Sequence, residues 1–199
     1  MGKLLKIILR AIVRAAILIY CKIVYRVKVI GKENIPKKGA LIFCGNHRNY
    51  VDPPLIVVTA GRFVHFIAKE ELRKVPLFAF LGVVFEAIYV KRDAKDIASI
   101  KTSLKYLKNG ECIALFPEGT RNGIEKGEKT KNGVSYFVLN SDAKVVPVGI
   151  KGGLKPFQKT IITYGKPMEF EEEKKNKKDK EVMDKVTDKI MKEIIELAK

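Results

Sequence analysis

The sequence predicts a single α/β domain in which helices flank a central sheet that is mostly parallel or mixed. Short apolar runs alternate with segments of helical spacing along most of the chain. The length of 199 residues suits one domain with its own core. Hydrophobic residues make up 47% of the chain and charged residues 31%, which excludes wholesale disorder. No uncharged run approaches the ~18–20 residues that span a bilayer, so a polytopic membrane protein is excluded as well.

Residues 1–24 are expected to form an amphipathic helix that precedes the domain, and the domain is expected to cover residues 25–199. Four cations recur three or four positions apart and share one side of this helix: Lys3, Lys6, Arg10 and Arg14. Leucine and isoleucine fill most of the remaining surface, and no acidic residue precedes Glu33. Such a helix is typical of segments that lie in a membrane interface, with apolar side chains among acyl chains and cations among anionic headgroups.

Two other interpretations of residues 1–24 stay open. One is a single short span whose charged side chains reach the interface, and the other is an ordinary amphipathic helix packed on the domain. A cleaved signal peptide is disfavoured, because Arg10 and Arg14 interrupt the apolar stretch and no small-residue cleavage site is evident. The favoured interpretation places the protein peripherally on the cytoplasmic face of the cell membrane.

The remaining elements follow from apolar runs and helical spacing. Seven short runs are predicted to be strands: 27–30, 40–44, 64–67, 83–90, 112–116, 145–150 and 160–164. Four segments are predicted to be helices: 52–60, 93–107, 132–139 and 178–198. Asp93 is the expected N-cap of the second of these helices. No internal repeat or low-complexity linker interrupts this order, which supports one domain.

The formal net charge of +17 indicates an anionic partner: nucleic acid, an anionic membrane surface or a phosphorylated substrate. Nucleic acid is not expected, because the N-terminal cations alternate with leucine and isoleucine rather than aromatic residues and no nucleic-acid motif is present. The three cysteines are far apart and form no C-x-x-C pair: Cys21, Cys44 and Cys112. This spacing argues against a zinc site and a disulfide framework, so buried free thiols are expected.

His47 and Asp52 are the first candidates for chemistry. His47 follows the predicted strand 40–44, and Asp52 opens the next predicted helix. A reversal of the chain between them brings the carboxylate onto one ring nitrogen, which fixes the tautomer and leaves the other nitrogen free to take a proton from a hydroxyl. By itself, this spacing is more often that of a core histidine beside an N-cap aspartate. His65 lies within a predicted strand and is expected to be structural.

The second candidate segment is FPEGTR at residues 116–121, after the predicted strand 112–116. Its proline and glycine predict a tight loop at the carboxyl end of a strand, where open α/β sheets build their sites. Arg121 offers two parallel N–H donors to a phosphate, and backbone amides near Gly119 can assist. Judged alone, the segment is also an ordinary turn with a surface arginine. Lys69 and Arg92 follow other predicted strands and would converge on the same anion if these strand ends share one edge.

Four blocks occur in order along the chain: NHRNYVDP at 46–53, the segment 82–92, FPEGTR at 116–121 and VPV at 146–148. Together they resemble the four motif blocks of the glycerolipid acyltransferases, most closely the bacterial 1-acyl-sn-glycerol-3-phosphate (lysophosphatidate) acyltransferases. The resemblance spans roughly residues 25–165, and the first and third blocks lie about 70 residues apart. The conjunction of these two blocks is highly specific, so it outweighs the ordinary structural interpretations of each block alone.

The resemblance implies that His47 and Asp52 form a catalytic dyad that works without an acylated enzyme residue. It also implies that a set of residues at strand ends binds the phosphate and glycerol of the acceptor: Lys69, Arg92, Glu118, Gly119, Thr120 and Arg121. The implied reaction transfers a fatty acyl group from acyl-CoA or acyl-carrier protein to the sn-2 hydroxyl of lysophosphatidate and forms phosphatidate. No metal and no cofactor other than this acyl donor are expected.

Two alternatives to this activity stay open. The nearer one is an acyltransferase of the same family that acts on glycerol-3-phosphate itself or on another lysophospholipid. The other is a basic protein without enzymatic activity that binds membranes or nucleic acid. Competition between acceptors separates the first alternative, and binding to vesicles but not to DNA separates the second.

Overall fold

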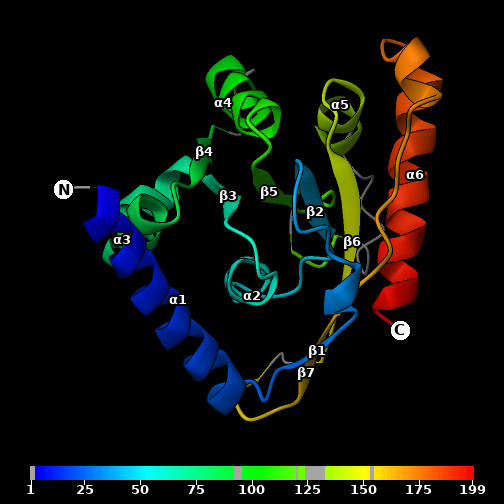
Figure 1. Ribbon diagram of the computed structural model, residues 1–199. Helices are drawn as coiled ribbons and strands as arrows, with labels where there is room; N and C mark the ends of the chain where they lie inside the picture. Colours follow the sequence, from blue (N-terminus) through cyan, green and yellow to red (C-terminus); the bar gives the residue numbers. More distant parts are fainter. Residues whose placement is uncertain (1–2, 92–95, 120, 124–132, 153–154) are drawn as a thin grey trace.

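The computed structural model describes residues 3–91, 96–119, 121–123, 133–152 and 155–199 (Figure 1). In these residues seven strands form one sheet in the order β1-β7-β6-β2-β5-β3-β4. The strands are β1 (Lys28–Ile30), β2 (Leu41–Gly45), β3 (Val64–Lys69), β4 (Ile88–Val90), β5 (Cys112–Leu115), β6 (Lys144–Gly152) and β7 (Thr160–Tyr164). Every neighbouring pair is parallel except β6 and β7, so the predicted mixed sheet is confirmed.

In the described part of the chain, the α-helices cover the sheet in two layers (Figure 1). One face carries α1 (Lys3–Val24), α2 (Asp52–Thr59) and α3 (Pro76–Val84). The opposite face carries α4 (Ile97–Lys108), α5 (Gly133–Leu139) and α6 (Lys180–Leu197). Short 3-10 segments complete the elements: η1 (Lys32–Asn34), η2 (Glu70–Lys74) and η3 (Glu173–Asn176). The predicted α/β class with helices on both faces is therefore confirmed.

The central strands are buried on both faces, which explains their continuous apolar sequences. In β5, Cys112 and Ala114 belong to the core under α1–α3, whereas Ile113 and Leu115 belong to the core under α4–α6. All five residues of β2 are buried. A parallel strand covered by helices on each side needs apolar residues at every position rather than at alternate positions.

Helix α3 is the main departure from the predicted elements. Residues 83–90 were expected to be one strand, but α3 continues to Val84 and β4 begins at Ile88. The run from 75 to 85 has no charged residue, and an apolar run alone does not distinguish a buried strand from a helix. Pro76 in the first helical turn is the signal that favours a helix here. Helix α4 likewise begins later than predicted and is capped by Asp96, while Asp93 lies outside the described residues.

The cations of α1 are oriented differently from the prediction. Arg10 donates to the carbonyl of Val84 at 2.9 Å and bonds to the carboxylate of Glu86. Arg14 donates to the carbonyl of Val58 at 3.2 and 3.3 Å. These carbonyls lie in the last turns of α3 and α2, where intrahelical donors are lacking and the helix dipole is negative. The expectation that Arg10 and Arg14 lie among lipid headgroups is therefore wrong, because both side chains attach α1 to the domain.

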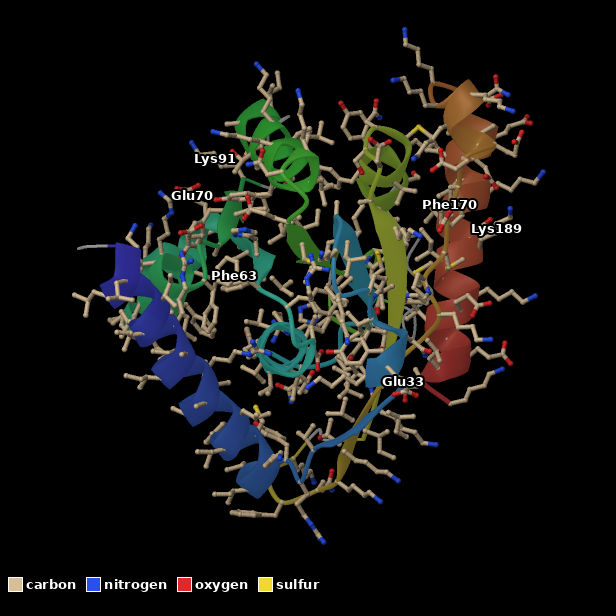
Figure 2. All side chains as sticks on the ribbon, viewed as in Figure 1. Glu33, Phe63, Glu70, Lys91, Phe170 and Lys189 are labelled. Carbon is tan, nitrogen blue, oxygen red and sulfur yellow. The ribbon has the colours of Figure 1, made fainter. Side chains whose placement is uncertain are left out.

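The outward side of α1 is apolar, and Figure 2 shows its all-carbon side chains pointing away from the domain. The exposed large apolar residues of α1 are Leu4, Leu5, Ile7, Ile8, Ile12, Ile19, Tyr20 and Ile23. Helix α3, which contacts α1, adds Leu77, Phe80 and Val83. A contiguous exposed apolar surface is typical of an interaction site. None of the helices in the described residues is long and apolar enough to cross a membrane.

The three cysteines are buried free thiols, as predicted. Burial raises the pKa of Cys21 and of Cys112 to about 11, and it raises the pKa of Cys44 further still. A thiol with so high a pKa stays protonated at neutral pH, and the protonated form is a poor nucleophile. The cysteines therefore serve as small apolar core residues.

Candidate active site

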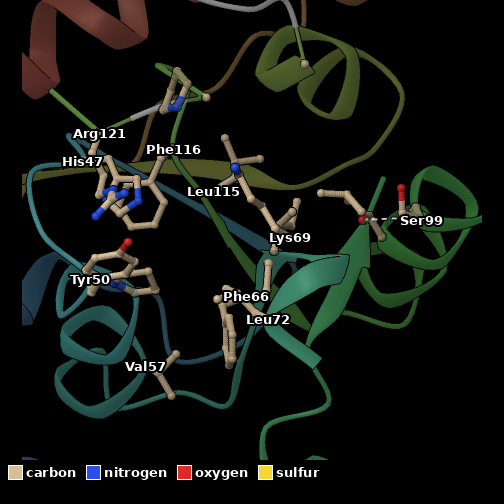
Figure 3. A pocket seen from close by; sticks show the side chains of 18 of the residues that line it. His47, Tyr50, Val57, Phe66, Lys69, Leu72, Ser99, Leu115, Phe116 and Arg121 are labelled. Atoms are coloured by element: carbon tan, nitrogen blue, oxygen red, sulfur yellow. Dashed lines mark hydrogen bonds between the residues drawn. The ribbon is translucent and has the colours of Figure 1, made fainter. Parts of the chain in front are cut away.

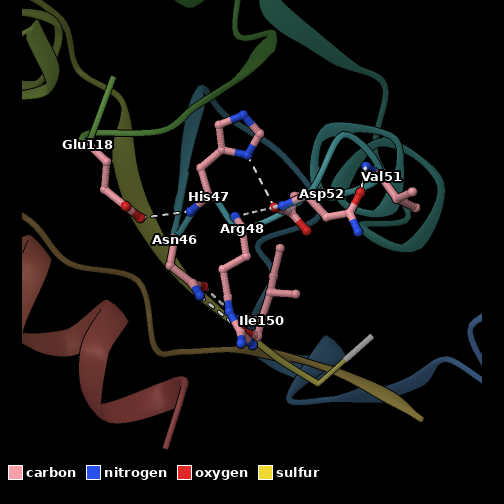
Figure 4. A network of polar contacts seen from close by, with 8 residues as sticks. Asn46, His47, Arg48, Val51, Asp52, Glu118 and Ile150 are labelled. Atoms are coloured by element: carbon pink, nitrogen blue, oxygen red, sulfur yellow. Dashed lines mark hydrogen bonds and ion pairs between the residues drawn. The ribbon is translucent and has the colours of Figure 1, made fainter. Parts of the chain in front are cut away.

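Two loops meet where β2 and β5 end, at the carboxyl edge of the parallel strands. The first loop leaves β2 through Asn46, whose side chain fixes it to the neighbouring strand β6. The Asn46 amide nitrogen donates to the carbonyl of Ile150 at 2.9 Å, and its oxygen accepts from the Ile150 amide at 2.7 Å (Figure 4). Both groups are buried, so this pair sets the direction in which the chain enters the site.

His47 and Asp52 form the predicted contact. The Nδ1 atom of His47 lies 3.1 Å from Oδ2 of Asp52 (Figure 4). The same oxygen accepts from the amides of Arg48 and Asn49, each at 2.6 Å. An ionised carboxylate can only accept, so Nδ1 carries the proton and Nε2 is left as the basic nitrogen. The Asp52 side chain is 4% exposed and that of His47 is 19% exposed, so the carboxylate is shielded while the imidazole remains reachable.

The position of Asp52 follows from its place at the first residue of α2. The helix dipole favours a negative charge at this end of the helix, and the amides that donate to Asp52 belong to Arg48 and Asn49 of the preceding loop. The Asp52 side chain turns back onto the preceding loop, and Pro53 tolerates the first turn because it has no N–H to satisfy. The local sequence therefore places a carboxylate against Nδ1 of the imidazole.

The second loop, of which residues 116–119 and 121–123 are described, packs against His47 from the other side. The Phe116 ring stacks on the imidazole with centroids 4.4 Å apart and planes at 26°. The Glu118 carboxylate accepts from the His47 amide at 2.7 Å, and the Asn122 amide donates to the His47 carbonyl at 2.6 Å. Ring, amide and carbonyl of the histidine are thus all held by one loop.

Arg121 lies against Tyr50, which belongs to the first loop. The guanidinium carbon is 3.8 Å from the centroid of the tyrosine ring. Stacking of this kind leaves the in-plane N–H groups of the guanidinium available to an anion. The two loops are therefore joined a second time, through Arg121, the residue predicted to bind phosphate.

One cavity of about 960 Å³ connects these groups (Figure 3). His47, Arg121 and Lys69 all line it. Its other walls are largely apolar and come from both faces of the sheet, including Val57, Phe66, Phe85, Leu115 and Phe137. In Figure 3, His47, Tyr50, Phe116 and Arg121 gather at one end, Ser99 lies at the other end, and Lys69 lies between them. An apolar cavity with a few convergent polar groups is the usual form of a small-molecule site.

The structure brings most of the predicted site residues together. His47, Asp52, Glu118 and Arg121 lie in or beside the contact between the two loops. The Gly119 amide donates to the carbonyl of Phe116 at 3.0 Å within the turn. Lys69, the last residue of β3, lines the same cavity as Arg121. That the two side chains bind one phosphate together stays a prediction. Arg92 and Thr120 lie outside the described residues.

Two site residues have no role that the sequence alone reveals. Tyr50 and Phe116 stand inside the motif blocks, but their contacts with Arg121 and His47 depend on the meeting of two loops that are distant in sequence. The signal in the sequence is one aromatic residue within each of these two motif blocks. His65 is buried and bonds to Glu111 and to the carbonyl of Glu86, away from the cavity, which agrees with the structural role expected for it.

Fold and site together define a class of protein. It is an α/β protein with a hydrogen-bonded histidine–aspartate pair at the carboxyl edge of its parallel strands and an arginine nearby in an apolar cavity. A family model described as Acyltransferase matches residues 26–151. This match covers more than half of the chain, and the chain therefore belongs to the acyltransferase family.

Individual relatives agree with this assignment. The chain is 31% identical over 139 residues to the 1-acyl-sn-glycerol-3-phosphate acyltransferase of Borreliella burgdorferi, covering 69% of this chain and 56% of that protein. It is 31% identical over 131 residues to the enzyme of the same name from Bacillus subtilis, covering 63% of each. The crystal structure of the 1-acyl-sn-glycerophosphate acyltransferase PlsC from Thermotoga maritima matches with a TM-score of 0.65 and 28% identity, covering 86% of this chain and 71% of that one. The chain thus spans 56–63% of the length of these two curated relatives.

Proposed function

We propose that the protein transfers a fatty acyl group from acyl-CoA or acyl-carrier protein to the sn-2 hydroxyl of lysophosphatidate and so forms phosphatidate. The observation that carries this proposal is the His47–Asp52 pair, 3.1 Å apart, in the same cavity as Arg121. The names of the similar proteins support the choice of acceptor. The thioester donor is a co-substrate, and the proposed reaction uses no metal or resident cofactor.

In the proposed reaction, Nε2 of His47 takes the proton of the sn-2 hydroxyl while the oxygen attacks the thioester carbonyl. Asp52 keeps Nδ1 protonated and stabilises the imidazolium that forms. The tetrahedral intermediate collapses by breaking the carbon–sulfur bond, and the imidazolium returns its proton to the leaving thiolate. The new ester bond, the free thiol and the neutral histidine balance the reaction without an acyl-enzyme.

The acceptor phosphate is proposed to bind to Arg121, with Lys69 as a second cation from the neighbouring strand end. A guanidinium fork matches two phosphate oxygens and so fixes the orientation of the glycerol as well as its position. Arg92, Gly119 and Thr120 remain part of the proposed acceptor site. Holding the hydroxyl next to Nε2 converts an encounter between two molecules into a step within one complex.

The first test is an assay of phosphatidate formation. Purified protein receives lysophosphatidate with either acyl-CoA or acyl-carrier protein, and the product is measured by mass spectrometry. Removing the base in His47→Ala is expected to lower kcat by about 100- to 10,000-fold. Lys108→Ala, an exposed position on α4, is the control and should keep full activity. Unchanged turnover in His47→Ala would exclude the proposed base.

The same assay decides between acceptors. Glycerol-3-phosphate and lysophospholipids with other headgroups are each offered in competition with lysophosphatidate. Preferential acylation of one of these compounds would mean that it, and not lysophosphatidate, is the acceptor. The proposed role of His47 as the base would be unchanged. Absence of acyl transfer to every acceptor, together with binding of lysolipid, would favour a lipid-binding protein instead.

The proposed location is the cytoplasmic surface of an anionic membrane, reached through the apolar sides of α1 and α3. This proposal is supported by the exposure of Ile12 and Ile19, which are 61% and 58% exposed, whereas Arg10 and Arg14 are used within the protein. An apolar helix face in the interface brings the cavity close to lysophosphatidate and its product.

Vesicle flotation tests this location. Ile12→Gln combined with Ile19→Gln is expected to reduce the bound fraction on anionic vesicles several-fold, because apolar surface no longer enters the acyl region. Ile30→Gln, an exposed apolar position on β1, is the matched control and should bind like the unmodified protein. Full retention of the double variant would show that another surface holds the protein to the membrane.

A further inference from the structure

Glu118 differs from its neighbours in its relation to the cavity. Pro117, Gly119 and Arg121 line it, whereas Glu118 is not among the described residues that do. Glu118 is 3% exposed, and one carboxylate oxygen accepts from the amide of His47 at 2.7 Å (Figure 4). The side chain that the motif resemblance assigns to the acceptor is therefore turned toward the backbone of the base.

Burial of a carboxylate at this point has a cost that demands an explanation. An ionised carboxylate loses several kcal/mol of hydration on burial unless hydrogen bonds replace it. A bond from a backbone N–H to a charged oxygen is shorter and about twice as strong as one to a neutral acceptor. Glu118 thus gives the amide of His47 a buried carboxylate oxygen as its acceptor, at 2.7 Å.

The opposite side of the same peptide is held by the same loop. The Asn122 amide donates to the carbonyl of His47 at 2.6 Å, and the Phe116 ring stacks on the imidazole. Asn122 has a φ of 58°, a conformation that asparagine adopts more readily than most residues. With amide, carbonyl and ring all fixed, the side chain of His47 has little freedom to leave the Asp52 carboxylate.

We infer that Glu118 is a positioning residue, which holds the backbone of His47 so that its imidazole meets Asp52 on one side and the acceptor hydroxyl on the other. It acts through His47 and does not bind the acceptor. The inference rests on the proposed function for its kinetic test. It gives the third motif block two separate tasks, since Arg121 faces the cavity while Glu118 faces the base.

The kinetic test compares Glu118→Ala with Glu118→Gln. The alanine variant removes the acceptor for the His47 amide, so kcat should fall about 10- to 100-fold while KM for lysophosphatidate stays within twofold. The glutamine variant keeps an oxygen at the same place and should recover at least a third of the kcat of the unmodified protein. Glu172→Ala, an exposed carboxylate near η3, is the control and should leave both constants unchanged.

The opposite pattern would overturn the inference. A rise of tenfold or more in KM for lysophosphatidate in both variants, with kcat preserved, would mean that Glu118 contacts the acceptor. If the alanine variant fails to fold, the glutamine variant alone still decides, because a positioning role preserves its acceptor KM and a binding role does not.

Hydrogen exchange of the His47 amide gives a readout that needs no turnover. In ¹⁵N-labelled full-length protein this amide should exchange slowly, remain protected in Glu118→Gln and exchange at least tenfold faster in Glu118→Ala. Equal protection in the alanine variant would overturn the inference. An unmodified protein that protects this amide but does not acylate lysophosphatidate would instead contradict the proposed function and leave the positioning role supported.

Discussion

The two ends of helix α2 make polar contacts that serve different purposes. At the N-terminal end, Asp52 accepts from the amides of Arg48 and Asn49 and contacts His47. At the C-terminal end, the carbonyl of Val58 accepts two bonds from Arg14 of α1. One end orients the proposed base, and the other end attaches the helix that carries the exposed apolar surface.

The difference between the two ends is one of sequence distance. The N-terminal contacts join residues three to five positions apart, so both partners of each contact belong to the loop and the first turn of α2. The Arg14 contact joins residues 44 positions apart and exists only after α1 has docked. The local chain therefore supplies both partners of these contacts, and Glu118 of the second loop holds the backbone of His47. The attachment of α1, by contrast, depends on the assembled domain.

The largest expected effect comes from altering the N-terminal end. Asp52→Asn should lower kcat by about 100- to 10,000-fold, because an amide can present an N–H to Nδ1 and so move the imidazole proton to the nitrogen that must accept one. Steady-state phosphatidate formation measures this loss. Asp179→Asn, which alters the N-cap of α6 away from the site, is the matched control and should keep its activity. Less than a tenfold loss in Asp52→Asn would mean that the carboxylate serves the fold rather than the base.

This contrast also explains what the sequence could predict. His47, Asp52 and their contact were predictable, since a strand exit, a helix start and a short spacing define them locally. The inward direction of Arg10 and Arg14 was not, because a helical pattern places cations on one side without saying which side meets the domain. Net charge gave no help, since it does not distinguish a solvated cation from one that caps a helix.

Helices and strands were likewise predictable where the local sequence defines them. Strand β7 was predicted at its observed bounds, Thr160–Tyr164, because its run of β-branched and aromatic residues lies between Lys159 and Gly165. Helix α3 was missed because its apolar run continues toward β4, and Pro76 is the one local signal for a helix there. In the structure this helix packs against α1 and η2. The meeting of Arg121 with Tyr50 was likewise beyond prediction, since two separate strand ends must first become neighbours.

An intermediate effect is expected at the C-terminal end of α2. Arg14→Ala should lower the free energy of unfolding by about 1–2 kcal/mol, since the carbonyl of Val58 loses a charged donor in the last helical turn. Urea denaturation followed by circular dichroism measures the change. Lys22→Ala, an exposed cation on the same helix, is the control and should change stability by less than 0.5 kcal/mol.

The activity of the same variant sharpens the comparison between the two ends. If the ends are independent, Arg14→Ala should keep the kcat of the unmodified protein in a detergent-solubilised assay, below the temperature at which α1 detaches. A loss of kcat comparable to that of Asp52→Asn would contradict the separation and would mean that docking of α1 also shapes the catalytic end.

The smallest expected effect concerns Tyr50, which stands just before α2 and supports Arg121 from the ring face. Tyr50→Leu should raise KM for lysophosphatidate by about two- to fivefold, the equivalent of a partly exposed cation–π contact of roughly 0.5–1 kcal/mol. Tyr50→Phe keeps a ring at this place and should change KM by less than twofold. The effect of Tyr50→Leu should also disappear in an Arg121→Ala background, because the ring then has no guanidinium to hold. An equal rise in KM in both backgrounds would mean that Tyr50 touches the acceptor directly, and the N-terminal end of α2 would then contribute to acceptor binding as well as to the orientation of the base.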